Sequence, residues 1–243
     1  MPRFFVDKNQ ITETAAYIEG EDVKHILRVL RLREGDMITV CDKCKMDYEC
    51  RISDIASDRV SAEIISSGEN RAESDIYLTL YQGMPKSDKM DYIVQKCVEL
   101  GVSKIVPVIT KRAVSRPNDA DKKVSRWQKI AEEAAKQCGR GVIPEIGKML
   151  GFDEALAEMC REDVLAVMPY ECETENKLRT VLCESGKKNI SIFIGPEGGF
   201  DDMEVAVARN RGVKTVTLGP RILRTETAPL AVCAAVMYEL GDW

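Results

Sequence analysis

Two apolar runs in the last third of the chain each lead into a loop of unusual composition. Residues 191–194 and 213–218 are rich in β-branched side chains, which is typical of buried strands. The first run is followed by GPEGG (195–199), and the second ends in LGPRILRTETA (218–228). In an open α/β sheet, ligands bind in the crevice outside the carboxyl ends of such strands. Both loops are therefore expected to border a ligand site.

The first loop favours close approach of the backbone to another group. Gly195, Gly198 and Gly199 can adopt positive φ without a Cβ in the way, and Pro196 stiffens the turn. The pattern is neither G-x-G-x-x-G nor a P-loop, and an ordinary strand-to-helix turn is an equal alternative. The residues that follow, DDME from 201, have the form of a helix N-terminal cap.

The second loop gathers polar side chains at one strand end and then opens a long apolar helix. Arg221, Arg224, Thr225, Glu226 and Thr227 all lie within seven positions. This density indicates a binding or catalytic cluster. The alternative is that Arg224 and Glu226 only cap and pair at the start of the helix.

The pattern of apolar residues changes at the polar stretch 66–74 (SSGENRAES), which is the expected linker between two domains. Before it, short alternating runs at 37–41, 48–52 and 60–65 and one helix at 22–30 predict a small β-rich barrel. After it, apolar strands alternate with helices. That alternation predicts a mainly parallel sheet with helices on both faces. The expected strands are 76–81, 105–109, 164–168 and the two runs above, and the expected helices are 87–100, 121–137 and 229–240.

Composition is that of a soluble globular protein, with 44% hydrophobic and 31% charged residues among 243. We find no signal peptide and no run of about 18 apolar residues. We therefore expect a cytoplasmic protein without a membrane segment. Nine cysteines, an odd number, fit a reducing compartment. Cys41 and Cys44 form one C-x-x-C, but the further ligands for zinc would be only Cys50 and His25, so no metal is expected.

Charge is distributed unevenly along the chain. The net charge of −5 argues mildly against a nucleic-acid partner, yet residues 84–140 hold 13 Lys and Arg against 7 Asp and Glu. Such a segment could form a basic surface for a phosphate backbone. The alternative is a pair of amphipathic helices whose basic sides are simply solvated.

The motifs GPEGGF and LGPRILRTETA, in this order, resemble the RsmE family of bacterial 16S ribosomal RNA methyltransferases. The likeness extends over essentially the whole chain. Further similar stretches are RFF at 3–5, the run from His25 through Arg31, Lys86 with KMD at 89–91, ELG at 99–101 and QCGR at 137–140.

The resemblance implies a fold and an assembly. Residues 1–70 are expected to form a PUA-like RNA-binding β-barrel, and residues 74–243 an α/β SPOUT-type methyltransferase domain with a parallel sheet and a trefoil knot. The subunits of such domains pair as homodimers. The final helix, PLAVCAAVMYEL, is apolar almost all the way around, so we expect it to serve both the core and the dimer interface.

The implied activity is S-adenosylmethionine-dependent methylation of uridine N3 in 16S ribosomal RNA of the small ribosomal subunit, without a metal. Two alternatives remain: a ribose 2′-O methyltransferase of the same fold, and an assembly factor without catalysis. Glu226 is expected to act as a base or to orient Arg224. The residues expected at the site are Arg221, Arg224 and Glu226 for catalysis; Met168, Gly195, Glu197, Gly198, Gly199, Leu218, Gly219, Ile222 and Leu223 for the cofactor; and Arg3, Lys86, Lys89, Arg112 and Arg140 for RNA.

Overall fold

The chain forms two compact units in a computed structural model that describes residues 1–115 and 119–243. Unit 1 consists of Met1–Glu73 together with Ala135–Ile143, and unit 2 of Ser74–Ala134 together with Pro144–Trp243. The short segment 135–143 was not expected in unit 1. Its role there rests on polar contacts between residues far apart in sequence, which no local pattern reveals.

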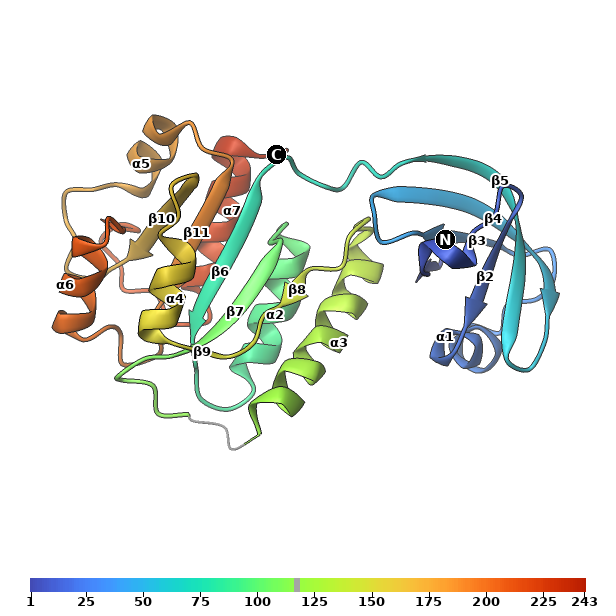
Figure 1. Cartoon of the computed structure of the whole chain (residues 1–243), viewed down its shortest axis with the longest axis horizontal. Helices are drawn as coiled ribbons and strands as arrows, with labels where there is room; N and C mark the ends of the chain where they lie inside the picture. Colours follow the sequence, from blue (N-terminus) through green and yellow to red (C-terminus); the bar gives the residue numbers. More distant parts are fainter. Residues whose placement is uncertain (116–118) are drawn as a thin grey trace. The chain divides into compact units, whose positions relative to one another are not determined.

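Unit 1 is built on a curled five-stranded sheet with strand order β1-β3-β4-β5-β2 (Figure 1). All neighbours pair antiparallel except β1 and β3, which are parallel. The predicted strands 37–41, 48–52 and 60–65 are confirmed, whereas the two N-terminal strands were missed. The elements are β1 (Arg3–Phe5), η1 (Lys8–Gln10), β2 (Ala15–Glu19), α1 (Glu21–Lys24), η2 (His25–Leu30), β3 (Met37–Cys41), β4 (Met46–Ile55) and β5 (Arg59–Glu69).

Segment 135–143 is held in unit 1 by a buried carboxylate. Glu73 accepts hydrogen bonds from Arg140 Nε (3.1 Å) and Nη2 (2.8 Å) and from the backbone N–H groups of Gly141 (2.9 Å) and Val142 (3.0 Å). The side chains of Glu73 and Arg140 are each only 6% exposed. The pair is therefore almost fully removed from water, and each charge depends on the other.

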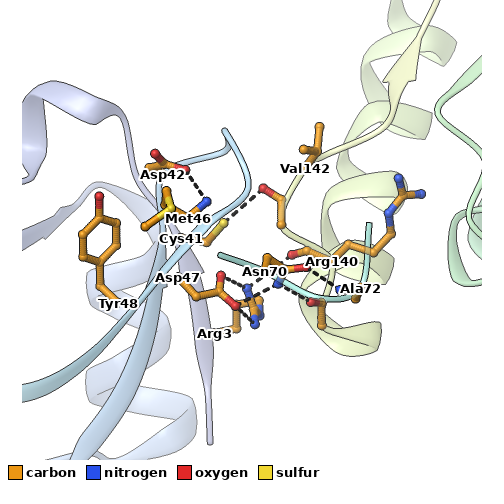
Figure 2. Close-up of polar contacts among 12 residues, drawn as sticks. Arg3, Cys41, Asp42, Met46, Asp47, Tyr48, Asn70, Ala72, Arg140 and Val142 are labelled. Carbon is orange, nitrogen blue, oxygen red and sulfur yellow. Dashed lines mark hydrogen bonds and ion pairs between the residues drawn. The ribbon is translucent and has the colours of Figure 1, made fainter. Parts of the chain in front are cut away.

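A second group of contacts lies beside this pair (Figure 2). Arg3 makes a bidentate ion pair with Asp47, at 2.6 and 2.7 Å. Asn70 donates to Asp47 (2.8 Å) and to the carbonyl of Gly139 (3.0 Å). The Cys41 thiol donates to the carbonyl of Gly141 (3.1 Å), and burial raises its pKa to about 12. The strands and the returning segment are thus joined by side-chain hydrogen bonds to backbone carbonyl groups, beside one ion pair between the strands.

Unit 2 contains a seven-stranded parallel sheet, which confirms the predicted α/β class. The strand order is β12-β10-β11-β6-β7-β8, and β9 also pairs with β7. The short elements β8, β9, α4 and α5 were not predicted. The elements are β6 (Tyr77–Gly83), α2 (Lys89–Glu99), β7 (Lys104–Ile109), α3 (Ala120–Cys138, whose last turn belongs to unit 1), β8 (Glu145–Ile146), β9 (Leu150–Gly151), α4 (Phe152–Met159), β10 (Val164–Pro169), α5 (Leu178–Ser185), β11 (Asn189–Ile194), α6 (Asp202–Asn210), β12 (Lys214–Val216) and α7 (Ala228–Leu240).

Helices cover both faces of this sheet (Figure 1). Helices α4 and α6 share one core with strand residues such as Phe193, while α7 packs against α2, α5 and β6. Two helix starts were tested by the structure. The Asp201–Glu204 capping box of α6 is confirmed, but the helix expected to begin at Ser87 begins at Lys89, because Ser87 has φ of 55° and cannot continue a right-handed helix.

The final helix contributes six of its 13 residues to the buried core, which accounts for part of its apolar character. Val232 and Val236 are fully buried within a single subunit, whereas Tyr238 is 72% exposed. Before this helix the chain leaves the edge strand β12 and reaches the ends of β11 and β6, where Thr225 contacts Gly195 and Gln82. The trefoil knot implied by the resemblance would lie at this crossing and stays a prediction.

No helix in the described ranges is both long and apolar enough to span a bilayer.

Replacing Arg140 by alanine leaves the Glu73 carboxylate buried without its cation. We expect the free energy of unfolding of unit 1 to fall by about 3–5 kcal/mol, measured by urea denaturation. The matched control is Lys43→Ala, which removes the exposed ion pair with Asp7 in the same unit and should cost at most about 1 kcal/mol. Similar losses in both variants would contradict the importance of the buried pair.

Candidate functional site

A cleft of about 780 Å³ lies in unit 2 where three neighbouring strands end. Its walls are the loops that follow β10, β11 and β12, so the two motifs singled out in the sequence face one cavity. The carboxyl ends of parallel strands meet at one edge of a sheet, which explains this meeting. The lining residues are Lys89, Pro169, Tyr170, Glu171, Glu173, Thr174, Lys177, Ile194, Gly195, Pro196, Glu197, Gly198, Gly199, Phe200, Thr217, Leu218, Gly219, Pro220, Arg221, Ile222, Leu223, Arg224, Thr225 and Ala228.

The buried Thr225 hydroxyl joins the two motif loops. It donates to the carbonyl of Gly195 (2.8 Å) and accepts from Gln82 Nε2 (3.1 Å). Gln82 is fully buried at the end of β6. These bonds fix the second loop against the first and against strand β6. Because they are buried, water does not readily replace them, and they hold the shape of the cleft.

The loop after β10 is tied to β12 through backbone and side chain. Tyr170 N–H donates to the Val216 carbonyl (3.0 Å), and Thr217 N–H donates to Asn176 (2.8 Å). Glu173 accepts from the Thr215 hydroxyl (2.7 Å) and from Arg209 (3.1 Å). The hydrogen bond from Thr215, with bonds from two backbone N–H groups, lowers the pKa of Glu173 to about 2. The ionised carboxylate therefore stabilises this wall.

Two glycines show what the loops require. A Cβ on Gly198 would lie 3.2 Å from the Cβ of Arg112, whose guanidinium donates to the Gly198 carbonyl (3.2 Å). The space beside Gly198, which we expected a ligand to use, is therefore partly occupied by the Arg112 side chain. Gly219 has φ of +104°, a conformation that other residues rarely adopt, and it leaves open space beside it.

Three charged side chains meet at one end of the cleft. The Lys89 ammonium lies 3.0 Å from Glu197 and 2.9 Å from Glu226. Glu197 also accepts from the backbone N–H of Lys86 (3.1 Å). The hydrogen bond from Lys89 lowers the pKa of Glu226, and the two carboxylates raise the pKa of Lys89. Both acids are therefore ionised, and Lys89 charged, at neutral pH.

Two arginines in the second loop are left exposed beside this cluster. Arg221 and Arg224 form no ion pair within 4 Å in the described part of the chain, although Arg224 contributes to the lowered pKa of Glu226. Ile222 between them is 85% exposed. The rim thus presents two available guanidinium groups and one apolar side chain, which suits a planar or anionic partner.

The structure brings together nearly all of the residues expected to bind cofactor or act in catalysis. There are two exceptions. The Met168 side chain is fully buried in the core, so the wall begins one residue later at Pro169. Glu226 does not line the cleft itself but pairs with Lys89, which does. Sequence reasoning missed the loop 169–177. Its signal was available, because the polar run YECETENK follows the predicted strand 164–168 as the other loops follow theirs.

The residues expected to contact RNA are scattered, and most have partners. Arg140 and Arg3 hold unit 1 together as described above, so we withdraw them as RNA contacts: burial and ion pairing use their charges. Lys89 belongs to the cleft cluster. Arg112 is 44% exposed at its side chain, near Asp201 and Gly198, and Lys86 is exposed.

The other basic residues of segment 84–140 are also largely paired with acids. Lys96 pairs with Glu99, Lys104 with Glu145, Lys111 with Asp201, Lys122 with Asp119, Arg126 with Asp91 and Lys136 with Asp22. In the described part of this segment, the local excess of positive charge therefore does not form a surface of unpaired cations.

Within residues 1–115 and 119–243, no group of three or more His, Cys, Asp and Glu side chains could hold a metal ion. Cys41 of the C-x-x-C pair is buried and donates to a carbonyl, whereas Cys44 is exposed.

Comparisons with known proteins agree with this geometry. A family model described as RNA methyltransferase domain matches residues 72–237, and one described as RNA methyltransferase PUA domain matches residues 18–65. Ribosomal RNA small subunit methyltransferase E of Bacillus subtilis is 36% identical over 98% of this chain and 97% of its own.

Two solved structures bound to S-adenosylmethionine are also similar. The ribosomal RNA small subunit methyltransferase E of Neisseria gonorrhoeae superimposes with a TM-score of 0.91 at 36% identity, over 100% of this chain and 99% of that one. A putative methyltransferase of Legionella pneumophila gives 0.88 at 28% identity, over 99% and 98%.

Glu173 allows a test of the cleft wall by pH. Because its pKa is lowered from 4.5 to about 2, its contribution to stability is present above pH 4.5 and is lost as pH falls towards 2. We expect wild type to exceed Glu173→Gln by about 1–2 kcal/mol in unfolding free energy at pH 6, and by less than half of that at pH 3. The exposed Glu184→Gln serves as control. A pH-independent difference would contradict an ionic role.

Proposed function

Because the chain belongs to the ribosomal RNA small subunit methyltransferase E family, we propose that it methylates N3 of a uridine in 16S ribosomal RNA, with S-adenosylmethionine as donor. It is an enzyme with a PUA domain and a SPOUT-type methyltransferase domain. The choice of N3 as acceptor is the finer part of the proposal, and it rests on the chemistry of the cleft rim.

The cleft suits the proposed cofactor in size and in the chemistry of its walls. Its volume lies in the usual range for small-molecule sites, and Ile194, Leu218 and Leu223 offer apolar contact. The exposed carboxylate of Glu171 favours a ligand with a cationic group. We propose that the backbone of Gly195, Gly198, Gly199 and Gly219 with Leu218, Ile222 and Leu223 holds the cofactor. When bound, S-adenosylmethionine supplies an electrophilic methyl group on its sulfonium.

The acceptor needs help from the protein, because N3 of uracil carries a proton at neutral pH. The single observation that carries the proposal is that Arg221 and Arg224 are exposed and have no ion-pair partner among residues 1–115 and 119–243. A cation close to the uracil oxygens stabilises the anion left when N3 loses its proton, and so lowers the N3 pKa. A ribose hydroxyl would not spread its developing charge over two carbonyl oxygens in this way.

For Glu226, the orienting role is better supported than that of a base. A base near neutral pH works best with a pKa close to that pH, whereas Lys89 lowers the pKa of this carboxyl. We propose that Glu226 fixes Lys89 and holds Arg224 by its charge. The Lys89 bridge to Glu197 then couples the two motif loops electrostatically.

We further propose that the enzyme acts in the cytoplasm as a homodimer, and that Lys86 and Arg112 contact the RNA. Tyr238 on α7 supports an interface, since this aromatic side chain is 72% exposed on a helix that is apolar along most of its length. Aromatic residues are enriched in the cores of such interfaces.

Modified substrates test the choice of acceptor. Small ribosomal subunits whose target uridine carries a 2′-O-methyl group should still accept a methyl group, and a cytidine in its place should abolish transfer. Incorporation is followed by nucleoside mass spectrometry. The opposite pair of results would assign the enzyme to the ribose hydroxyl, and absence of transfer to any subunit would favour an assembly factor without catalysis.

The same assay tests the arginines. We expect Arg224→Ala to lower the single-turnover rate about 100-fold, because it removes a donor aimed at developing charge. Affinity for S-adenosylmethionine, measured by calorimetry, should change less than threefold. Arg161→Ala, an exposed arginine before β10 at the other end of the sheet, is the control. Equal rates in both variants would exclude Arg224 from the chemistry.

The dimer is tested on the exposed side of α7. Val232 and Val236 are unsuitable, because substitution of these fully buried residues would disrupt the core itself. Tyr238→Glu should convert a dimer into a folded monomer at micromolar concentration in analytical ultracentrifugation. Met203→Glu, an equally exposed position on α6, should leave the dimer intact. A monomeric wild type would remove the interface from the proposal.

A further inference from the structure

Residues 24–33 of unit 1 form an outward-facing surface that the site described above does not use. We call it the 24–33 surface. It consists of the exposed side chains of Lys24, His25, Leu27, Arg28, Val29, Leu30, Arg31 and Arg33.

The apolar side chains of this surface face solvent, because neighbouring residues of the same segment are the ones that pack into the core of unit 1. Val23 and Ile26 are at most 1% exposed in the hydrophobic core of unit 1, and Leu32 packs against that core. Outside this anchor, Val29 is 66% exposed, Leu27 38% and Leu30 37%. Three large aliphatic side chains so close in sequence and rimmed by charge are typical of an interaction site.

The charges of this surface are all positive and are not neutralised. Residues 24–33 hold four cations and no acid. In the described ranges Arg28, Arg31 and Arg33 form no ion pair, in contrast to most cations of segment 84–140. A site that binds phosphate groups requires cations of this kind, because an arginine already paired with a carboxylate releases few counterions.

The backbone holds these side chains in a defined arrangement. Residues 25–30 form a π-helix, and Arg31 at its end has φ of 55°, a left-handed conformation that is unusual for arginine. The N–H of Leu32 donates to the Ile26 carbonyl (3.1 Å) and closes the turn. The surface is therefore a fixed element of unit 1.

We propose that the 24–33 surface binds an unpaired segment of the RNA substrate, an inference that rests on the proposed function. The arginines would contact phosphate groups, while the aliphatic side chains cover the faces of unstacked bases or ribose rings. Duplex RNA keeps its bases stacked inside the helix and offers no such apolar surface. The positive charge likewise favours a polyanion over a second copy of this acidic chain.

The experiment measures binding of the full-length protein to a fluorescein-labelled, unstructured 20-nucleotide RNA and to a 20-base-pair duplex, at several salt concentrations. Arg28→Gln combined with Arg33→Gln should weaken single-strand binding and reduce the slope of log K against log salt by about 1.4, which corresponds to two phosphate contacts. Leu27→Ser combined with Val29→Ser should weaken it about tenfold at unchanged slope and leave duplex binding unaffected.

The matched control is Lys8→Gln with Arg51→Gln, which removes two exposed cations of unit 1 that also lack ion pairs in the described chain. Its salt slope should stay within about 0.3 of wild type. Equal slopes in the two double variants would overturn the proposal, as would a loss of duplex binding in the serine variant. A shift in oligomeric state of that variant would identify a contact between copies and would also overturn it.

Failure of this inference can be told apart from failure of the proposed function. With small ribosomal subunits from cells that lack the gene, both double variants of the 24–33 surface should raise KM at least fivefold while kcat and affinity for S-adenosylmethionine are unchanged. If wild type methylates the subunits and the variants match it, only the 24–33 surface is wrong. If wild type does not methylate them, the proposed function itself falls.

Discussion

When helices cover both faces of a parallel sheet, a ligand can reach it only at the ends of its strands, and this constraint determines where the site of unit 2 lies. Strands β10, β11 and β12 all end at the same edge, so the loops after them must meet whatever their sequences are. What the sequence adds is the means of fixing them. The Thr225 hydroxyl joins two loops to β6, and Glu173 joins the third to β12. The cleft is thus a property of the topology, and its shape is a property of a few buried hydrogen bonds.

Charge is divided within the cleft between pairs that set geometry and groups that remain available. Lys89 lies between Glu197 and Glu226, and its positive charge is balanced by these two carboxylates. Arg221 and Arg224, a short distance along the same loop, have no such partners in the described chain. The same division exists in unit 1: Arg3 and Arg140 are paired with carboxylates, whereas the arginines of the 24–33 surface have no such partner in the described ranges. Residue type alone does not distinguish these roles.

Much of unit 2 could be predicted because its signals are local. Apolar runs, the Asp201 capping box and the two motif loops were all recognised, and the structure confirms their places. The misses have a common physical origin. Arg140 and Met168 look like ligands from their neighbours in sequence, but their burial is set by Glu73 and by the helices across the sheet. Short elements such as β1 and α5 carry too few residues for a period to be visible.

The place of segment 135–143 in unit 1 has a consequence for how the chain folds as it is synthesised. Residues 1–73 leave the ribosome first, yet the cation and the two N–H groups that Glu73 needs are made some seventy residues later. Until then, burial of the unpaired carboxylate is unfavourable, so we expect the end of β5 and the residues up to Glu73 to stay exposed to solvent. The N-terminal unit is therefore completed only after the first strands and helices of the catalytic unit have emerged. Its final closure is coupled to the synthesis of the residues that follow α3.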